Sequence, residues 1–120
     1  MKILIVDDDQ DMCEILSDFL RDEGYAVITA SDGESALSSI KNKKYDLLIL
    51  DYQLHGITGL YVLEKAHQID SSLIAIMISA FGSEQIRSQA QELGVYDFVE
   101  KPFDMEKIVE AVNQALCQRR

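Results

Sequence analysis

The stretch from residue 2 to residue 9 constrains the fold of this chain most strongly. Four large apolar residues, Ile3 to Val6, end in the three consecutive acids Asp7, Asp8 and Asp9. The apolar run is too short to favour a helix, and its β-branched content is typical of a strand buried on both faces, as in a parallel sheet. Open α/β folds keep their ligand sites at the carboxyl edge of such a sheet. Three adjacent acids at that edge repel one another, so the sequence predicts a positive group close to them.

The same pattern returns in residues 45–51, where an apolar run again ends in an acid, Asp51. Further strands are predicted at residues 25–30, 73–79 and 96–99, and amphipathic or glycine-bounded helical segments separate them. Strand and helix therefore alternate five times. This alternation predicts a single α/β domain over residues 1–120, with a flavodoxin-like (βα)5 fold. Its five-stranded parallel sheet has the order 2-1-3-4-5 and carries helices on both faces.

Helix starts are also predicted from local patterns. Asp9 and Asp11 are both candidates to cap the first helix. Ser31 and Glu34 have the spacing of a capping box at the start of the second helix.

His55 and His67 have no partner at the spacing of a metal site or catalytic triad, and they are expected at the surface.

Composition limits the classes of function. The chain has 120 residues, an apolar content of 48% and a net charge of −10, which suits one globular domain. The negative charge disfavours direct contact with nucleic acid or an anionic membrane. Cys13 and Cys117 lack metal-ligand spacing and are expected to be reduced thiols. Neither a signal pattern nor an apolar run of about 20 residues is found, so a soluble, cytoplasmic domain is predicted.

Chemically useful side chains stand at four predicted strand ends. The first strand ends at Asp7 and Asp8, the third at Asp51, the fourth at Ser79 and the fifth at Lys101. In the order 2-1-3-4-5 the first and third strands are neighbours at the point where ligands bind. Clustered carboxylates favour a hard cation, Mg²⁺ rather than a transition metal. Such a cluster with a lysine and a hydroxyl suits an aspartate that accepts a phosphoryl group.

Four short motifs make the chain resemble a response-regulator receiver domain over essentially its full length. They are Val6-Asp7-Asp8, Leu50-Asp51, Ser79-Ala80 and Lys101-Pro102-Phe103. Each motif is weak alone, but four in the right order at strand ends are specific.

The resemblance implies that Asp51 is the phosphoacceptor and takes its phosphoryl group from a histidine kinase or histidine phosphotransfer protein. It implies that Asp8, Asp51 and the backbone carbonyl of Gln53 bind Mg²⁺ directly and that Asp7 acts through water. Such a domain is a self-phosphorylating and self-dephosphorylating switch and no turnover enzyme.

The resemblance also assigns residues to the phosphoryl group and to the switch. Ser79 is expected to hydrogen-bond a phosphoryl oxygen, and Lys101, before a cis Pro102, to pair with the phosphoryl group or Asp51. Phe98 stands at the switch aromatic position and is expected to turn inward as Ser79 moves toward the phosphoryl group. Homodimerisation through the last helix–strand–helix face is a further expectation.

Some positions depart from the usual family pattern. The loop after Asp51 lacks the usual proline, which is expected to loosen it. Phe98 has no phenol, so switching would rest on packing. Gln53 and Phe81 would flank the path of the attacking water, and the bulk of Phe81 is expected to slow self-dephosphorylation.

Two other function classes were weighed. Asp7 and Asp9 after a hydrophobic strand also resemble the nucleophile motif of haloacid-dehalogenase-like phosphatases, but this chain is short for that family and Asp51 would have no role. A degenerate receiver that binds partners without phosphorylation is disfavoured by the complete set of acids, hydroxyl and lysine.

Overall fold

The computed structural model describes residues 1–54, 56–80 and 84–117. It contains a five-stranded parallel sheet in the order β2-β1-β3-β4-β5, which confirms the predicted flavodoxin-like topology. The elements follow one another as β1 (Lys2–Val6), α1 (Gln10–Asp22), β2 (Ala26–Ala30), α2 (Gly33–Asn42), β3 (Leu47–Asp51), α3 (Gly59–Ile69), β4 (Ile74–Ser79), α4 (Glu84–Glu92), β5 (Asp97–Glu100) and α5 (Met105–Cys117).

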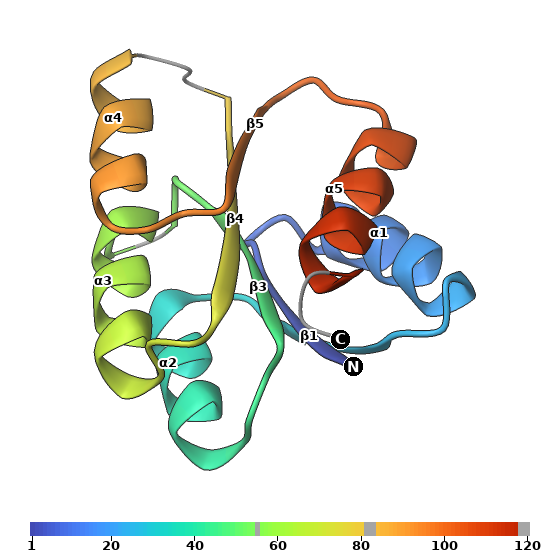
Figure 1. The fold of residues 1–120 in the computed structure, drawn as a ribbon, viewed down its shortest axis with the longest axis horizontal. Helices are drawn as coiled ribbons and strands as arrows, with labels where there is room; N and C mark the ends of the chain where they lie inside the picture. Colours follow the sequence, from blue (N-terminus) through green and yellow to red (C-terminus); the bar gives the residue numbers. More distant parts are fainter. Residues whose placement is uncertain (55, 81–83, 118–120) are drawn as a thin grey trace.

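Helices cover both faces of the sheet. Figure 1 shows α1 and α5 together on one side and α2, α3 and α4 on the other. Successive residues of a strand point to opposite faces, so an uninterrupted apolar run supplies both cores. In β1, Ile3 and Ile5 pack toward α1 and α5, whereas Leu4 and Val6 pack toward α2 and α3. The apolar run that opens the chain therefore forms the centre of two hydrophobic layers.

Helix caps fix the first turns of α1 and α2. The Asp9 side chain accepts a hydrogen bond from the backbone N–H of Met12 at 3.2 Å, so Asp9 and not Asp11 is the N-cap of α1. The predicted capping box at Ser31 is wrong, because Asp32 caps α2 by accepting from the Ser35 N–H at 2.7 Å. Ser31 lies one residue too early, because β2 continues to Ala30 and α2 begins only at Gly33.

The prediction that His67 is a surface residue is also wrong. The ring is half-buried between the end of α3 and two neighbouring loops. Its Nδ1 lies 2.9 Å from the carbonyl oxygen of Leu93, and its Nε2 lies 2.9 Å from that of Leu73. His67 therefore joins α3 to the start of β4 and to the end of α4. His55, for which the same prediction was made, lies outside the described residues.

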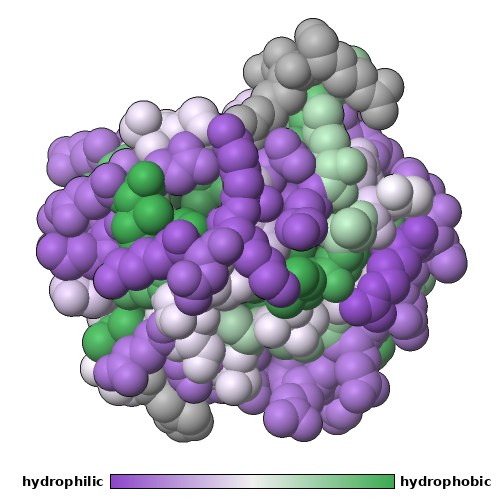
Figure 2. All heavy atoms as spheres, turned by 90° about the horizontal axis from the view of Figure 1, so that it is seen from below, coloured by the Kyte–Doolittle hydropathy of each residue, from purple (hydrophilic) through white to green (hydrophobic). Residues whose placement is uncertain are grey.

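The edge of the sheet at which the strands begin lies opposite the edge that carries Asp7, Asp8 and Asp51. Figure 2 views the molecule from this side and shows a mainly hydrophilic surface with small, separate hydrophobic patches. Within the described part of the chain, none of the helices combines the length and the apolar character needed to cross a bilayer.

Candidate functional site

The ends of β1 and β3 bring Asp7 and Asp51 together. Val6 pairs with Leu50 in the sheet register, so the next residues, Asp7 and Asp51, stand side by side at the carboxyl edge. Both are buried, with 3% and 6% of their surfaces exposed. Asp7 accepts from the Asp9 N–H at 3.0 Å, and Asp51 accepts from the Gln53 N–H at 3.0 Å. These backbone donors fix the orientation of both carboxylates.

Lys101 supplies the positive group predicted beside the acids. Its Nζ lies 3.0 Å from Asp51 Oδ2 and 3.6 Å from Asp7 Oδ2, so one ammonium contacts both carboxylates. The Lys101–Pro102 peptide bond is cis, as predicted. The backbone N–H of Lys101 donates to the Ser79 carbonyl at 2.8 Å, which joins the ends of β4 and β5.

The site is electrostatically unbalanced even with this lysine. Burial raises the pKa of the Asp7 carboxyl to about 6; the charge of Asp51 also raises this pKa, whereas Lys101 and the Asp9 N–H lower it. Burial alone would lower the pKa of Lys101, but its hydrogen bond to Asp51 and the charges of Asp51 and Asp7 raise it overall. Lys101 thus stays charged, and the carboxylate pair still favours further positive charge.

A divalent cation fits this excess of carboxylates. One carboxylate oxygen from each of Asp7, Asp8 and Asp51 lies within 4.8 Å of the others. An all-oxygen, carboxylate-rich donor set matches the preference of Mg²⁺ and Ca²⁺, and a site with few protein ligands matches Mg²⁺ better, because Mg²⁺ retains several waters. The residues present therefore fit the group that the sequence predicts.

The loop between β3 and α3 is held closely against the site. The N–H of Gly59 donates to the Tyr52 carbonyl at 2.7 Å, and Gln53 and Thr58 form a β-bridge. A Cβ on Gly59 would overlap the Asp51 carbonyl oxygen, so only glycine fits there. The Ile57 side chain packs over Gly33, where a Cβ would collide with it. The loop that was expected to be loosened for lack of a proline is thus anchored at both ends.

The fourth and fifth strands complete the edge. Ser79 is fully buried at the end of β4 and pairs with Glu100 in the register of β5. Phe98 is 7% exposed and belongs to the hydrophobic cluster beneath α2, α3 and α4. Its ring therefore already occupies an inward position. Phe81, to which the sequence assigned an effect on hydrolysis, lies outside the described residues.

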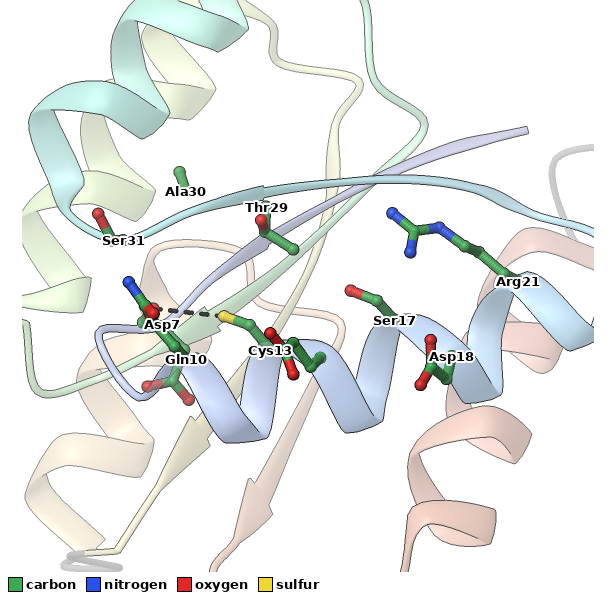
Figure 3. Close-up of a pocket in the computed structure, with 10 residues that line it drawn as sticks. Asp7, Gln10, Cys13, Ser17, Asp18, Arg21, Thr29, Ala30 and Ser31 are labelled. Carbon is green, nitrogen blue, oxygen red and sulfur yellow. Dashed lines mark hydrogen bonds between the residues drawn. The ribbon is translucent and has the colours of Figure 1, made fainter.

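A groove of about 510 Å³ adjoins the site between α1 and β2. Figure 3 shows this groove, with Cys13 and Ser17 on α1 and Thr29 on β2. The Cys13 thiol donates to the Asp7 carbonyl at 3.3 Å, which ties α1 to the end of β1. Burial, with the nearby charge of Asp7, raises the pKa of this thiol to about 11, so it stays protonated and unreactive. The buried Ser17 hydroxyl has no hydrogen-bond partner among the described residues.

The sequence thus located Asp7, Asp8, Asp51, Ser79 and Lys101 at one sheet edge. In the structure the three acids gather within 4.8 Å, and Lys101 contacts Asp7 and Asp51. The sequence missed the contact of Cys13 with Asp7, because a hydrogen bond from a lone thiol to a carbonyl has no sequence pattern. The close approach of Gly59 to the Asp51 carbonyl oxygen is likewise visible only in three dimensions.

Known proteins match this arrangement in sequence and in structure. A family model described as the response regulator receiver domain matches residues 3–113. The sporulation initiation phosphotransferase F of Bacillus subtilis is 33% identical over 115 residues, covering 96% of this chain and 93% of that protein. The transcriptional regulatory protein CpxR of Escherichia coli is 39% identical over 118 residues, covering 96% of this chain and 49% of that protein. The chain spans only 27% of another such relative, the transcriptional regulatory protein ZraR of Salmonella typhimurium.

Solved structures agree with these relatives. A two-component response regulator from Clostridium difficile has a TM-score of 0.95 at 28% identity, covering 100% of this chain and 98% of that one. The response regulator TrrA from Thermotoga maritima, in complex with Mg²⁺-BeF, has a TM-score of 0.85 at 32% identity, covering 95% of this chain and 97% of that one. The phosphatase and degenerate alternatives are not favoured by any of these matches. The chain belongs to the response regulator receiver family of two-component phosphorelay signalling.

Proposed function

We propose that this receiver accepts a phosphoryl group on Asp51 in a Mg²⁺-dependent reaction and uses it as a switch. The contact of Lys101 Nζ with both Asp51 and Asp7, beside the third carboxylate of Asp8, carries the proposal. The N–H of Gln53 holds Asp51 Oδ1, so Oδ2 is the oxygen directed at the lysine. A fixed, partly buried carboxylate beside a cation is suited to attack a phosphorus atom in line with its leaving group.

Asp8, Asp51 and the Gln53 carbonyl would hold Mg²⁺, and Asp7 would do so through water. The raised pKa of Asp7 is consistent with this assignment, because burial first, and then the charge of Asp51, disfavours the charged carboxylate in the absence of a further cation. The ion, when bound, would offset the negative charge of the phosphoryl oxygens. The waters that Mg²⁺ retains would let Asp7 contribute without direct ligation.

Lys101 and Ser79 would bind the phosphoryl oxygens. The ammonium is already within 3.0 Å of the Asp51 oxygen at which the new P–O bond would form. Ser79 ends β4 next to β3, and its hydroxyl would donate to a phosphoryl oxygen from that side. Fixed donors of this kind stabilise developing charge without rearrangement.

The donor would be a histidine kinase or a histidine phosphotransfer protein, and the product a changed α4–β5–α5 face for a partner or a second copy. We propose that the domain acts in the cytoplasm, and that it makes no direct contact with nucleic acid. As a signalling switch it would act without turning over an external substrate.

Intact-mass analysis with acetyl phosphate and Mg²⁺ tests the proposal. One added phosphoryl group is expected in the parent chain, and none in Asp51→Asn or after chelation of Mg²⁺. Asp9→Asn is the matched control, because asparagine caps a helix as well as aspartate and Asp9 only caps α1. Phosphorylation that persists in Asp51→Asn but disappears in Asp7→Asn would instead identify the phosphatase-like nucleophile, and its absence in the folded parent chain would favour the degenerate receiver.

A further inference from the structure

Arg87 on α4 contacts two side chains of β5 at once. Its guanidinium carbon lies 4.7 Å from the centre of the Phe98 ring, and its Nη2 donates to Glu100 Oε1 at 2.7 Å. Phe98 and Glu100 are two residues apart, so they project from the same face of the strand. One planar side chain therefore covers the aromatic ring and pairs with the carboxylate next to it.

These two contacts matter because the described residues of α4 bury little apolar surface. Ala90 is the single fully buried side chain among the described residues of α4, whereas α5 buries five. An exposed ion pair contributes little by itself, and Arg87 and Glu100 are 38% and 51% exposed. A guanidinium can stack on the ring and hydrogen-bond to the carboxylate in one conformation. Both contacts then stabilise the structure, while the entropy cost of ordering the arginine side chain arises only once. Arg87 is thus a main link between α4 and β5.

The link is close to the phosphorylation site. Glu100 pairs with Ser79 in the sheet register, and the next residue, Lys101, donates its N–H to the Ser79 carbonyl. The Lys101 side chain then reaches Asp51. Arg87 is therefore connected to Asp51 through two consecutive residues, Glu100 at the end of β5 and Lys101 directly after it.

We propose that Arg87 is a positioning residue that holds the Phe98 ring inward and so favours the phosphorylated state of Asp51. The inference rests on the proposed function, in which the inward ring accompanies phosphorylation. A contact that stabilises the inward ring stabilises whatever state requires it, and the coupling is reciprocal. Arg87 would then set how strongly occupation of the site changes the α4–β5 surface.

Beryllofluoride with Mg²⁺ is the probe, because TrrA, a structural relative, was solved in complex with Mg²⁺-BeF. Its affinity is measured by amide chemical shifts on titration of the whole chain. Arg87→Met, which keeps the length and loses the charge, is expected to weaken beryllofluoride binding about two- to fivefold. Arg87→Lys is expected to behave similarly, since an ammonium lacks the planar fork. Arg21→Met is the control. Arg21 lies on α1 and donates to the carbonyl of Val27 on β2, so its loss should leave the affinity for beryllofluoride as in the parent.

A double-mutant cycle separates positioning from a merely structural role. Phe98→Leu keeps an apolar side chain at the position but removes the aromatic face. The Arg87→Met change should then weaken beryllofluoride binding much less in the Phe98→Leu background than in the parent. Equal weakening in both backgrounds, or unchanged binding in Arg87→Met, would overturn the inference alone. If the parent chain bound no beryllofluoride, or Asp51→Asn bound it equally well, the proposed function would fail first and the inference with it.

Discussion

The strands that end at the acids, β1 and β3, and the helix α4 are anchored very differently. All five residues of β3 are buried, and Ile3 to Val6 of β1 are at most 1% exposed. By contrast, α4 buries only Ala90 fully among its described residues, and the partly buried Ile86 and Leu93, the latter just after the helix, add to this apolar contact. The reactive carboxylate therefore stands on a tightly packed strand, whereas α4, the helix whose Arg87 covers Phe98, buries little apolar surface.

This difference suits a switch. A phosphoacceptor needs fixed geometry, which dense packing on both faces of β1 and β3 supplies. A responding surface needs two arrangements of similar free energy, and elements with little buried apolar surface open and rearrange most easily. The contrast also explains why a single exposed arginine can matter on α4, whereas the same residue on α1 would add little.

The largest effect on stability should come from truncating a buried side chain of β3, one of the tightly packed strands. Leu50→Ala, next to Asp51, removes a fully buried side chain and is expected to lower the unfolding free energy by about 3 kcal/mol. Ile86→Ala, the matched truncation on α4, is expected to cost about 1 kcal/mol, because its side chain is only partly buried. Urea unfolding at constant Mg²⁺ measures both. Equal losses would break the comparison.

A smaller effect on stability should come from the cost of ionising the buried Asp7 carboxyl beside Asp51. The pKa of Asp7 rises from 3.8 in the unfolded reference to about 6 in the folded chain. Between these values the folded chain keeps a proton that the unfolded chain has released, so this group lowers stability as the pH rises. Without Mg²⁺, Asp7→Asn should therefore be more stable than the parent by about 2 kcal/mol at neutral pH, with the difference vanishing toward about pH 4.

Thermal unfolding across this pH range measures the effect, with Asp9→Asn as the control that leaves the buried pair intact. A parent chain that is stabilised as the pH rises from about 4 to 7, with no gain in Asp7→Asn, would contradict the strain at this site.

The smallest effects should come from two serine hydroxyls, of which the buried Ser17 lacks a hydrogen-bond partner among the described residues and the half-buried Ser39 has one. Ser17 has no partner among the described residues, so Ser17→Ala is expected to raise stability by about 1 kcal/mol. Ser39 shares a hydrogen bond of 2.5 Å with the Tyr45 hydroxyl, and Ser39→Ala is expected to lower stability by about 1 kcal/mol. Thermal unfolding of the pair gives the signs. A lower stability of Ser17→Ala than of the parent would contradict the prediction, because it would mean that the Ser17 hydroxyl stabilises the fold.

The fold was predictable because the strands are unbroken apolar runs and each ends in a chemically distinctive residue. Strand order then placed Asp7 and Asp51 side by side, so the core of the candidate site followed from local pattern plus topology. The cap at Asp32 was not predictable from pattern alone, since Ser31 and Asp32 both make good caps and the end of β2 decides between them.

Contacts between distant segments were the part that sequence could not supply. The two ring nitrogens of His67 each lie 2.9 Å from a carbonyl oxygen, one 26 and one 6 residues away in the sequence, and a lone histidine carries no signal for either contact. Arg87 reads as a solvated charge on a polar helix, and its stacking on Phe98 depends on how α4 lies across β5. Such contacts are set by the packing of whole elements and leave no short-range pattern.

Mapping the phosphorylated residue tests the central claim most directly. Borohydride reduces an aspartyl phosphate to homoserine, so the chain treated with acetyl phosphate and Mg²⁺ can be reduced, digested and sequenced by mass spectrometry. The account predicts homoserine at position 51 and aspartate retained at positions 7 and 8. Homoserine at position 7 or 8, with Asp51 unmodified, would contradict it.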